Sequence, residues 1–296
     1  MCLLFLLFFA NPLKRFYYKE RIGLIKALEQ CFISPLGIGK IQFRHFFLAD
    51  VITSMHSLLK EFATFFTFMY ARDQPWRFST APAKLQETVI IAIVIGFVPD
   101  LIRFSQCVKK YFVLRSQGNP AAPMQAKNAG KYFSALVAEA AHLWAHGDAR
   151  DTAFWVWLFF KTFSTIYKYI WDLRVDWGLL RFWKISDFGL REKQYYPKFF
   201  YYWAIFTNFV LRFSFFYWTF VPISLMQEDV DLWSVLKLKL GISLVLEAYR
   251  RTQWSLLRVE NENINNFEGY RQILKIPPLI GSQQDAAIER LRRLLG

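Results

Sequence analysis

The sequence has few cysteines, and their arrangement excludes the sites that cysteines usually build. Cys2, Cys31 and Cys107 are odd in number and include no CxxC pair, so they define neither a disulfide framework nor a zinc site. His142 and His146 are four residues apart, but the chain lacks an HExxH motif. Thirteen glycines and eleven prolines without a fixed period exclude collagen-like and low-complexity chains. We therefore expect no metal ion and no other cofactor.

Apolar and aromatic residues are abundant instead. Of the 296 residues, 54% are apolar and 19% are aromatic, a composition that excludes disorder. A soluble domain is about 45–50% apolar, and the excess here indicates that part of the chain contacts lipid. The composition predicts an all-α fold, a polytopic transmembrane helical bundle.

Hydropathy along the chain predicts about six spanning helices. Residues 1–10 form an apolar run without a preceding basic region, which is typical of the truncated end of a helix and not of a signal peptide. The candidate spans that follow are 46–70, 87–106, 131–146, 152–171, 197–225 and 232–249. We expect a first segment of residues 1–45 with a basic cytosolic linker, a transmembrane domain of residues 46–260, and a cytosolic tail of residues 261–296.

The net charge of +14 is explained by membrane topology. The segments between the spans alternate in basic content, and the two alternating sets carry 26 and 4 Lys and Arg residues. Because basic loops stay on the cytosolic side, both ends of the six-helix unit are predicted to be cytosolic. RNA-binding motifs are absent, so nucleic acid is not an expected partner.

Many charged residues lie within or at the ends of the predicted spans, where each costs from about 2.5 to more than 10 kcal/mol unless it faces protein or water. They are Asp50, Lys60, Glu61, Asp100, Arg103, Lys131, Glu139, Lys161, Asp172, Asp176, Arg212, Glu247, Arg250 and Arg251. Asp172 and Asp176 share one helical face and need cations nearby, and Glu247 and Arg251 have the same spacing. Converging arginine forks suit tetrahedral oxyanions, so the set predicts a site for a phosphate-like ligand.

Two other interpretations of the charges remain open. The first is a ring of interhelical salt bridges that only holds the bundle together. The second is an intramembrane enzyme in which Asp172 and Asp176 bind Mg²⁺ and a lipid-linked phosphate. Such sites normally gather more carboxylates, and the surrounding charge here is basic, so we do not expect an enzyme.

Ordered blocks of the chain resemble the EXS domain family, whose members include phosphate exporters and smaller Golgi proteins of the Erd type. The similarity runs from about residue 11 to residue 271. Its blocks are Phe46–Asp50, Arg103–Cys107 with Lys109–Tyr111, Asn128–Tyr132, Trp171–Gly178, Leu211–Phe213, and Glu247–Arg251 with Arg258–Glu262.

The resemblance implies a phosphate path through six helices. Position by position it assigns the phosphate site to Asp50, Lys131, Tyr132, Asp172, Asp176, Arg212, Arg250 and Arg251. The cations bind the anion, while the acids hold the cations in place and limit affinity so that phosphate can leave. The chain departs from the family at Thr53, where the exporters have Asn, and at Phe215, where they have a gating Trp.

The resemblance also implies partners and a location. The expected partners are inorganic phosphate and the lipid bilayer, and the plasma membrane and the Golgi membrane are both candidate locations. Exporters of the family carry an SPX domain and four further spans, and residues 1–12 resemble the end of the last of these. A homodimer or a partner supplying the SPX function is therefore expected. The alternative function is a Golgi membrane protein for phosphate recycling, or for retention and sorting of Golgi proteins through the tail.

Overall fold

The structure is a computed structural model that describes residues 17–33, 43–54, 56, 59, 82–145, 151–180, 189–220 and 232–265. Within these ranges the regular structure is entirely helical, so the all-α prediction is confirmed for them. The apolar run at residues 1–10, the second half of the span 46–70 with Lys60 and Glu61, His146 and most of the tail lie outside the described residues.

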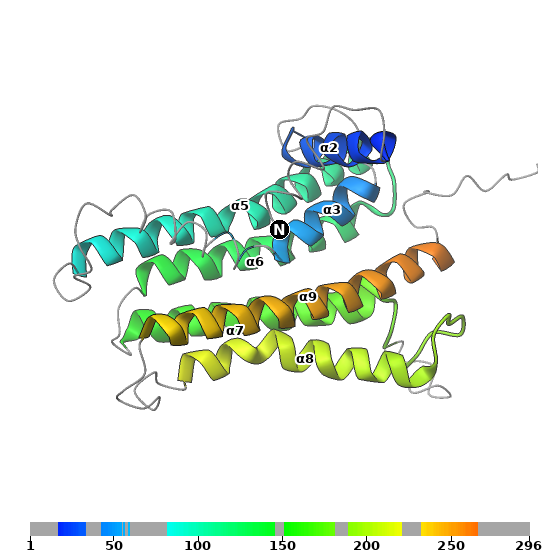
Figure 1. Ribbon diagram of the computed structural model, residues 1–296. Coiled ribbons are helices and arrows are strands. Elements are labelled where there is room, and N and C mark those ends of the chain that lie inside the picture. Colours follow the sequence, from blue (N-terminus) through cyan, green and yellow to red (C-terminus); the bar gives the residue numbers. More distant parts are fainter. Residues whose placement is uncertain are drawn as a thin grey trace, which may run out of the picture. The chain divides into compact units, whose positions relative to one another are not determined.

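Three of the described helices extend beyond the apolar stretches that predicted them. They are α2 (Tyr18–Ile33), α3 (Phe43–Ser54), α5 (Pro82–Ser116), α6 (Ala122–Trp144), α7 (Thr152–Trp171), η2 (Asp172–Asp176), α8 (Lys198–Phe220) and α9 (Leu232–Asn265), drawn in Figure 1. The span 152–171 coincides with α7. In contrast, α5, α6 and α9 continue through polar sequence, because tertiary packing as well as hydropathy decides where a helix ends.

Judged by length and hydropathy, no helix in the described ranges qualifies as a membrane span. The polytopic arrangement stays a prediction.

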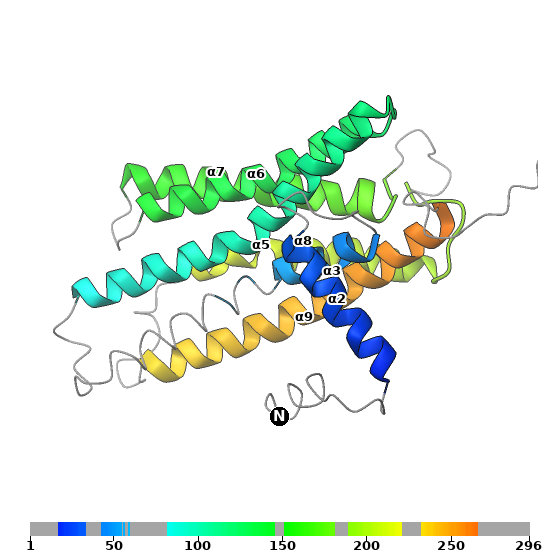
Figure 2. The same ribbon diagram turned by 90° about the horizontal axis from the view of Figure 1, so that it is seen from above.

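The helices pack in a closed cycle. Helix α3 contacts α5, and the cycle continues through α6, α7, α8 and α9, which returns to α3. Figures 1 and 2 show the long antiparallel neighbours α5, α6 and α7 side by side, with α2 against α3. Side chains that face inward from these six helices therefore surround a common space.

Short connections fix the order of α5, α6 and α7. Gly118 ends the α5 segment with a φ of 63°, a left-handed conformation that glycine adopts without a Cβ clash. The side chain of Asn119 then accepts a hydrogen bond from the Ala121 amide at 2.9 Å. Asp151 caps α7 by accepting a hydrogen bond from the Phe154 amide at 3.0 Å, as N-cap aspartates do.

Helix α7 does not end at Trp171 but continues as the π-helical turn η2. The Trp177 amide donates to the Asp172 carbonyl at 2.8 Å, which is the i to i+5 bond of a π turn. Gly178 follows with a φ of 64°. A Cβ on Gly178 would lie 2.7 Å from Oδ1 of Asn261, and the amide of Asn261 donates to the Asp176 carbonyl at 2.9 Å. Helix α9 therefore locks the turn.

Apolar packing surrounds the same turn. Leu173, Trp177, Trp254 and Leu257 are buried in one cluster. Each is at most 2% exposed. Apolar packing and the hydrogen bond from Asn261 therefore both hold η2 in place.

Cys31 lies at the contact between α2 and α3. Its Sγ donates to the His45 carbonyl at 3.2 Å, and burial raises the pKa of the thiol to about 11. Neither Cys31 nor Cys107 forms a disulfide, so Cys31 is a protonated thiol at neutral pH.

Candidate functional site

A polar cavity of about 330 Å³ lies inside the cycle of helices. Its walls come from α3, α5, α6, α7, η2, α8 and α9. A water molecule occupies about 30 Å³ in the liquid, so the cavity is large enough for a small ion together with several waters.

All the site residues predicted from sequence line this cavity. They are Asp50, Lys131, Tyr132, Asp172, Asp176, Arg212, Phe215, Arg250 and Arg251. The fold thus brings together residues that are up to two hundred positions apart in the chain. Their role in binding is taken up as a proposal below.

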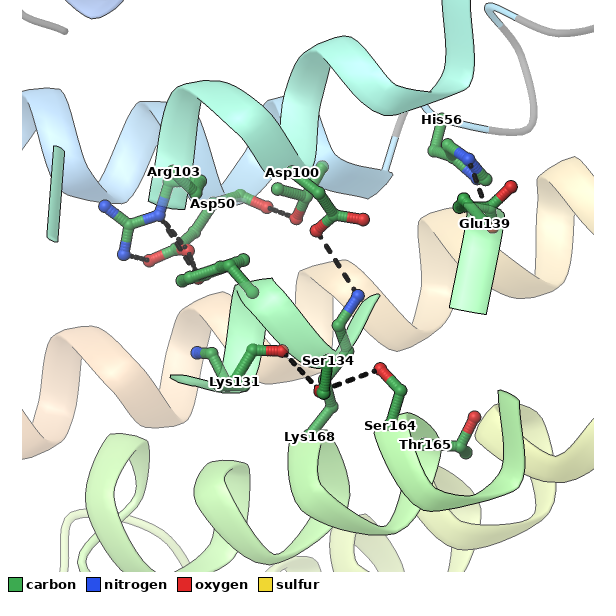
Figure 3. A network of polar contacts seen from close by, with 12 residues as sticks. Asp50, His56, Asp100, Arg103, Lys131, Ser134, Glu139, Ser164, Thr165 and Lys168 are labelled. Carbon is green, nitrogen blue, oxygen red and sulfur yellow. Dashed lines mark hydrogen bonds and ion pairs between the residues drawn. The ribbon is translucent and has the colours of Figure 1, made fainter. Parts of the chain in front are cut away.

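At one end of the cavity, Asp50 is held by two neighbours (Figure 3). Arg103 approaches it with both ends of its fork, with Nε 2.7 Å from Oδ1 and Nη2 3.1 Å from Oδ2. The Tyr132 hydroxyl also donates to Asp50. Arg103 is 2% exposed and lies over the Phe46 ring at 4.9 Å. Arg103 does not line the cavity, and it orients the carboxylate of Asp50, which does. The sequence analysis did not assign this role to Arg103.

The two aspartates of η2 both reach the cavity and take different partners. Asp172 accepts hydrogen bonds from Asn208 Nδ2 at 3.1 Å and from Arg212 Nε at 2.9 Å. Asp176 accepts one from Trp254 Nε1 at 3.2 Å, and Arg258 Nε lies 3.7 Å away. The expectation that two like charges on one face need cations is met by residues of α8 and α9.

Helix α9 places Glu247, Arg250 and Arg251 on the cavity wall. Glu247 contacts Arg250, with its carboxylate oxygens 2.8 Å from Nε and 2.5 Å from Nη2. The i, i+4 spacing suggested Arg251 as the neighbour of Glu247, but Arg251 instead donates to Ser54 and, at 3.3 Å, to the Thr53 hydroxyl. It therefore ties α9 to α3.

Lys131 and Arg251 share a setting of aromatic rings. The Lys131 ammonium lies 4.4 Å from the Tyr132 ring centroid and 4.9 Å from that of Trp171. The Arg251 guanidinium lies 4.5 Å from the Trp254 ring centroid. Ring faces attract cations by about 0.5–2 kcal/mol, and they leave the positive charge in place.

The other end of the cavity carries a cluster around Glu139, whose members Glu139 and Lys161 are in the predicted set of charged residues and whose member His56 is not. Glu139 lies 3.4 Å from Lys161, 3.6 Å from His56 and 3.9 Å from His142. Between the two ends, Lys168 contacts Asp100 at 3.3 Å (Figure 3).

A sequence signal for part of this wall was available. Lys161, Ser164, Thr165 and Lys168 recur at helical spacing within the aromatic helix α7 and lead to Asp172. Such a stripe predicts one polar face. The sequence analysis did not single out His56.

In the described part of the chain, the cavity lining carries six acids and six Lys or Arg side chains. Each lining acid contacts a basic residue, in the pairs Asp50–Arg103, Asp100–Lys168, Glu139–Lys161, Asp172–Arg212, Asp176–Arg258 and Glu247–Arg250. All except the last join different elements, as the salt-bridge interpretation expects. Among the described residues, no carboxylate lies within 4 Å of Lys131 or of Arg251. These two basic side chains thus have no direct carboxylate contact within the described residues.

The acids of η2 do not resemble a magnesium site. Asp172 and Asp176 contact arginine and other nitrogen donors. No group of three potential metal ligands from His, Cys, Asp and Glu occurs in the part of the chain that the structure describes.

Phe215 lies on the cavity wall one turn after Arg212. Its ring stacks on Phe216, with centroids 4.5 Å apart. An aromatic side chain is therefore present where the resemblance places the gate.

Comparison with known proteins identifies the family of the chain. The EXS family matches residues 1–264. The xenotropic and polytropic retrovirus receptor 1 homolog of Xenopus laevis is 31% identical over 296 residues, which cover 94% of this chain and 41% of that protein. Solute carrier family 53 member 1 of Mus musculus is 32% identical over 304 residues, covering 95% and 41%. The receptor 1 homolog of Danio rerio is 32% identical over 295 residues, covering 95% and 40%.

The chain spans about two fifths of the length of these relatives. The family match extends over nearly the whole chain and includes every residue of the cavity. The chain belongs to the EXS family.

Proposed function

We propose that this chain is a polytopic membrane domain that conducts inorganic phosphate through the cavity. The observation that carries the proposal is the convergence of the predicted site residues on one cavity, where no carboxylate of the described residues contacts Lys131 or Arg251. Arginine and lysine provide the donors that phosphate oxygens accept. The name of a relative, solute carrier family 53 member 1, and the resemblance to phosphate exporters support the same reading.

The outer surface of α7 supports a membrane setting. Trp155, Phe159, Phe163, Ile166 and Ile170 are all exposed, and their spacing places them on one stripe of the helix. The polar stripe of the same helix, from Lys161 to Lys168, lines the cavity. A helix with its charges inward and its large apolar residues outward suits lipid outside and a polar path inside.

The acids of the cavity fit conduction better than permanent capture. In Asp172–Arg212 and Glu247–Arg250, a carboxylate already occupies donors of the fork. A passing phosphate competes with these carboxylates, so its affinity is limited and release is possible. Phe215 is the proposed gate because an aromatic ring on the wall can narrow the passage.

The proposal includes an orientation with both ends of residues 46–260 in the cytosol, as the distribution of Lys and Arg indicates. The location is the plasma membrane or the Golgi membrane. The partners, beyond phosphate and lipid, are a second copy of the chain or a chain that supplies an SPX domain. Epitope insertion within residues 71–81 and within residues 181–188, with and without membrane permeabilisation, tests the orientation.

Radiolabelled phosphate efflux from proteoliposomes tests the function. Arg251→Gln removes a charged donor, which contributes about 1.5–3 kcal/mol, so half-saturation is expected to rise roughly ten- to a hundredfold. Lys127→Gln on α6 is the matched control, because Lys127 is exposed and does not line the cavity. Efflux that is the same for Arg251→Gln, for the combined variant Arg250→Ala with Arg251→Ala, and for the control contradicts the proposal.

A further inference from the structure

We infer that the cavity contains a proton-binding site at the end around Glu139, where protonation of His56 releases Lys161 to bind the permeating oxyanion. The inference rests on the proposed function and adds to it a second ligand of the cavity, the proton. It follows from two basic side chains that approach the same carboxylate oxygen.

The first step is the geometry of the cluster, in which Figure 3 shows His56 beside Glu139. Lys161 Nζ lies 3.4 Å and His56 Nε2 lies 3.6 Å from one oxygen of Glu139, Oε1. His142 Nδ1 lies 3.9 Å from the other oxygen, Oε2. An imidazole forms an ion pair with a carboxylate only when it carries a second proton. With both imidazoles neutral, the charge of Glu139 is therefore balanced by Lys161.

The second step is the effect of a proton on His56. The imidazolium is a second cation at Oε1, so it competes with Lys161 for that oxygen. Lys161 is able to move away, because its side chain is 31% exposed and ends a flexible four-carbon stem. An ammonium that leaves Glu139 has three donors for the oxygens of an anion. Lys161 and His56 both line the cavity, so the released charge acts on an anion inside it.

The third step is the charge of the lining. Among the described lining residues, His56 is the one group that ordinarily changes charge between pH 6 and pH 8. The acids and the Lys and Arg side chains of this lining are equal in number, so a proton on His56 makes the lining more positive. A cleft of opposite charge concentrates a charged substrate. By reciprocity, an anion that prefers the protonated site also raises the proton affinity of that site.

Other charged groups face His56 from the neighbouring helices. In the same cluster they are Glu139 and His142 of α6 and Lys161 of α7. Farther along the wall they are Asp100 of α5, Lys168 of α7, Arg212 of α8, and Glu247, Arg250 and Arg251 of α9. Of these groups only His142 ordinarily titrates near neutral pH. It stacks on Trp157 with centroids 5.0 Å apart and does not line the cavity, so its charge acts mainly on Glu139.

The test measures phosphate flux in proteoliposomes of the full chain at pH 6 and pH 8, with equal pH on both sides and phosphate below saturation. Phosphate itself changes protonation in this range, but it does so for every variant, so the ratio of the two fluxes is compared between variants. We expect the ratio of pH 6 to pH 8 flux to fall several-fold in His56→Gln. His56→Lys carries a permanent cation, so its ratio should fall likewise, while its flux at pH 8 should exceed that of His56→Gln several-fold.

His45→Gln is the matched control. His45 ordinarily titrates in the same range and does not line the cavity, so the flux ratio of this variant should equal that of the unmodified chain, whatever its absolute rate. A ratio that falls equally in His45→Gln and His56→Gln overturns the inference. The ratio of His56→Lys decides the question if His56→Gln does not fold.

Calorimetry of phosphate binding to the solubilised protein provides a second readout. Titrations near pH 7 in buffers of different ionisation enthalpy count the protons that are taken up with each phosphate. The unmodified chain should take up more protons than His56→Gln. Equal proton uptake, or an equal flux ratio, in the unmodified chain and the His56 variants overturns the inference while the proposed function stands. Absence of both phosphate flux and phosphate binding in the unmodified chain refutes the proposed function itself.

Discussion

The two ends of the cavity use the same residue types in different arrangements. Around Glu139, Lys161 contacts the carboxylate directly, and Lys168 contacts Asp100 nearby. At the other end, Asp50 pairs with Arg103, which does not line the cavity. Lys131 and Arg251 lie against aromatic rings there.

This difference teaches that basic residues in one cavity do different work. A cation that contacts a carboxylate neutralises it and holds two elements together. A cation on an aromatic ring keeps its charge available for a ligand. Removing a paired cation should therefore damage the fold, and removing an unpaired one should damage binding.

The largest effect is expected from Arg212→Gln. This change leaves Asp172 as a buried carboxylate without its cation, and its side chain is only 4% exposed, so the free energy of unfolding should fall by about 3–5 kcal/mol. Denaturant unfolding in detergent measures it, and Arg174→Gln, an exposed position on η2, is the control. Equal stability of the two variants would show that the contact between Arg212 and Asp172 does not stabilise the fold.

A smaller loss of stability is expected from Gly178→Ala. Gly178 and Gly118 both have a positive φ, which costs about 1–2 kcal/mol for a residue with a Cβ. Only at Gly178 does the new Cβ also meet Asn261, at 2.7 Å, and displacing that side chain adds about 1–3 kcal/mol. Thermal unfolding of Gly178→Ala and Gly118→Ala separates the cost of the positive φ from the cost of displacing the Asn261 side chain. Similar midpoints for both variants mean that Asn261 does not lock η2.

Lys131→Met is expected to behave in the opposite way. Because no carboxylate of the described residues contacts Lys131, its removal strands no buried acid, and the free energy of unfolding should stay within about 1 kcal/mol of that of the unmodified chain or rise. The same unfolding experiment measures this. A loss as large as that of Arg212→Gln would show that Lys131 is structural.

The smallest effect is expected at Phe215, which lines the cavity but carries no charge. Phe215→Ala should widen the passage and raise phosphate flux a few-fold. Phe216→Ala is the control, because Phe216 stacks on Phe215 and does not line the cavity. Equal flux changes in both variants point to packing and not to a gate.

Much of the fold could be predicted from the sequence, because apolar residues recur at the spacing of a helix. The bounds of α7 coincide with the predicted span because Asp151 caps one end. The extension of α9 to Asn265 could not be predicted from hydropathy. Its last turns are polar, and Glu260 and Asn261 are buried against the segment that follows η2.

The membership of the cavity wall was also largely predictable, since an acid or an arginine within an apolar helix needs a polar surrounding. The partners were not. The sequence spacing of Glu247 suited Arg251, yet the side chain contacts Arg250. Lys168 and His56 were not among the predicted site residues, although Lys168 belongs to the polar stripe of the aromatic helix α7.

The sequence by itself determined that this chain forms apolar helices with a set of inward charges, because residue type and helical periodicity place apolar and charged side chains on different faces of a helix. Only the tertiary structure decided which charges cancel. Pairing depends on distances of a few ångströms between elements far apart in the chain, and these distances leave Lys131 and Arg251 facing the cavity with their charge intact.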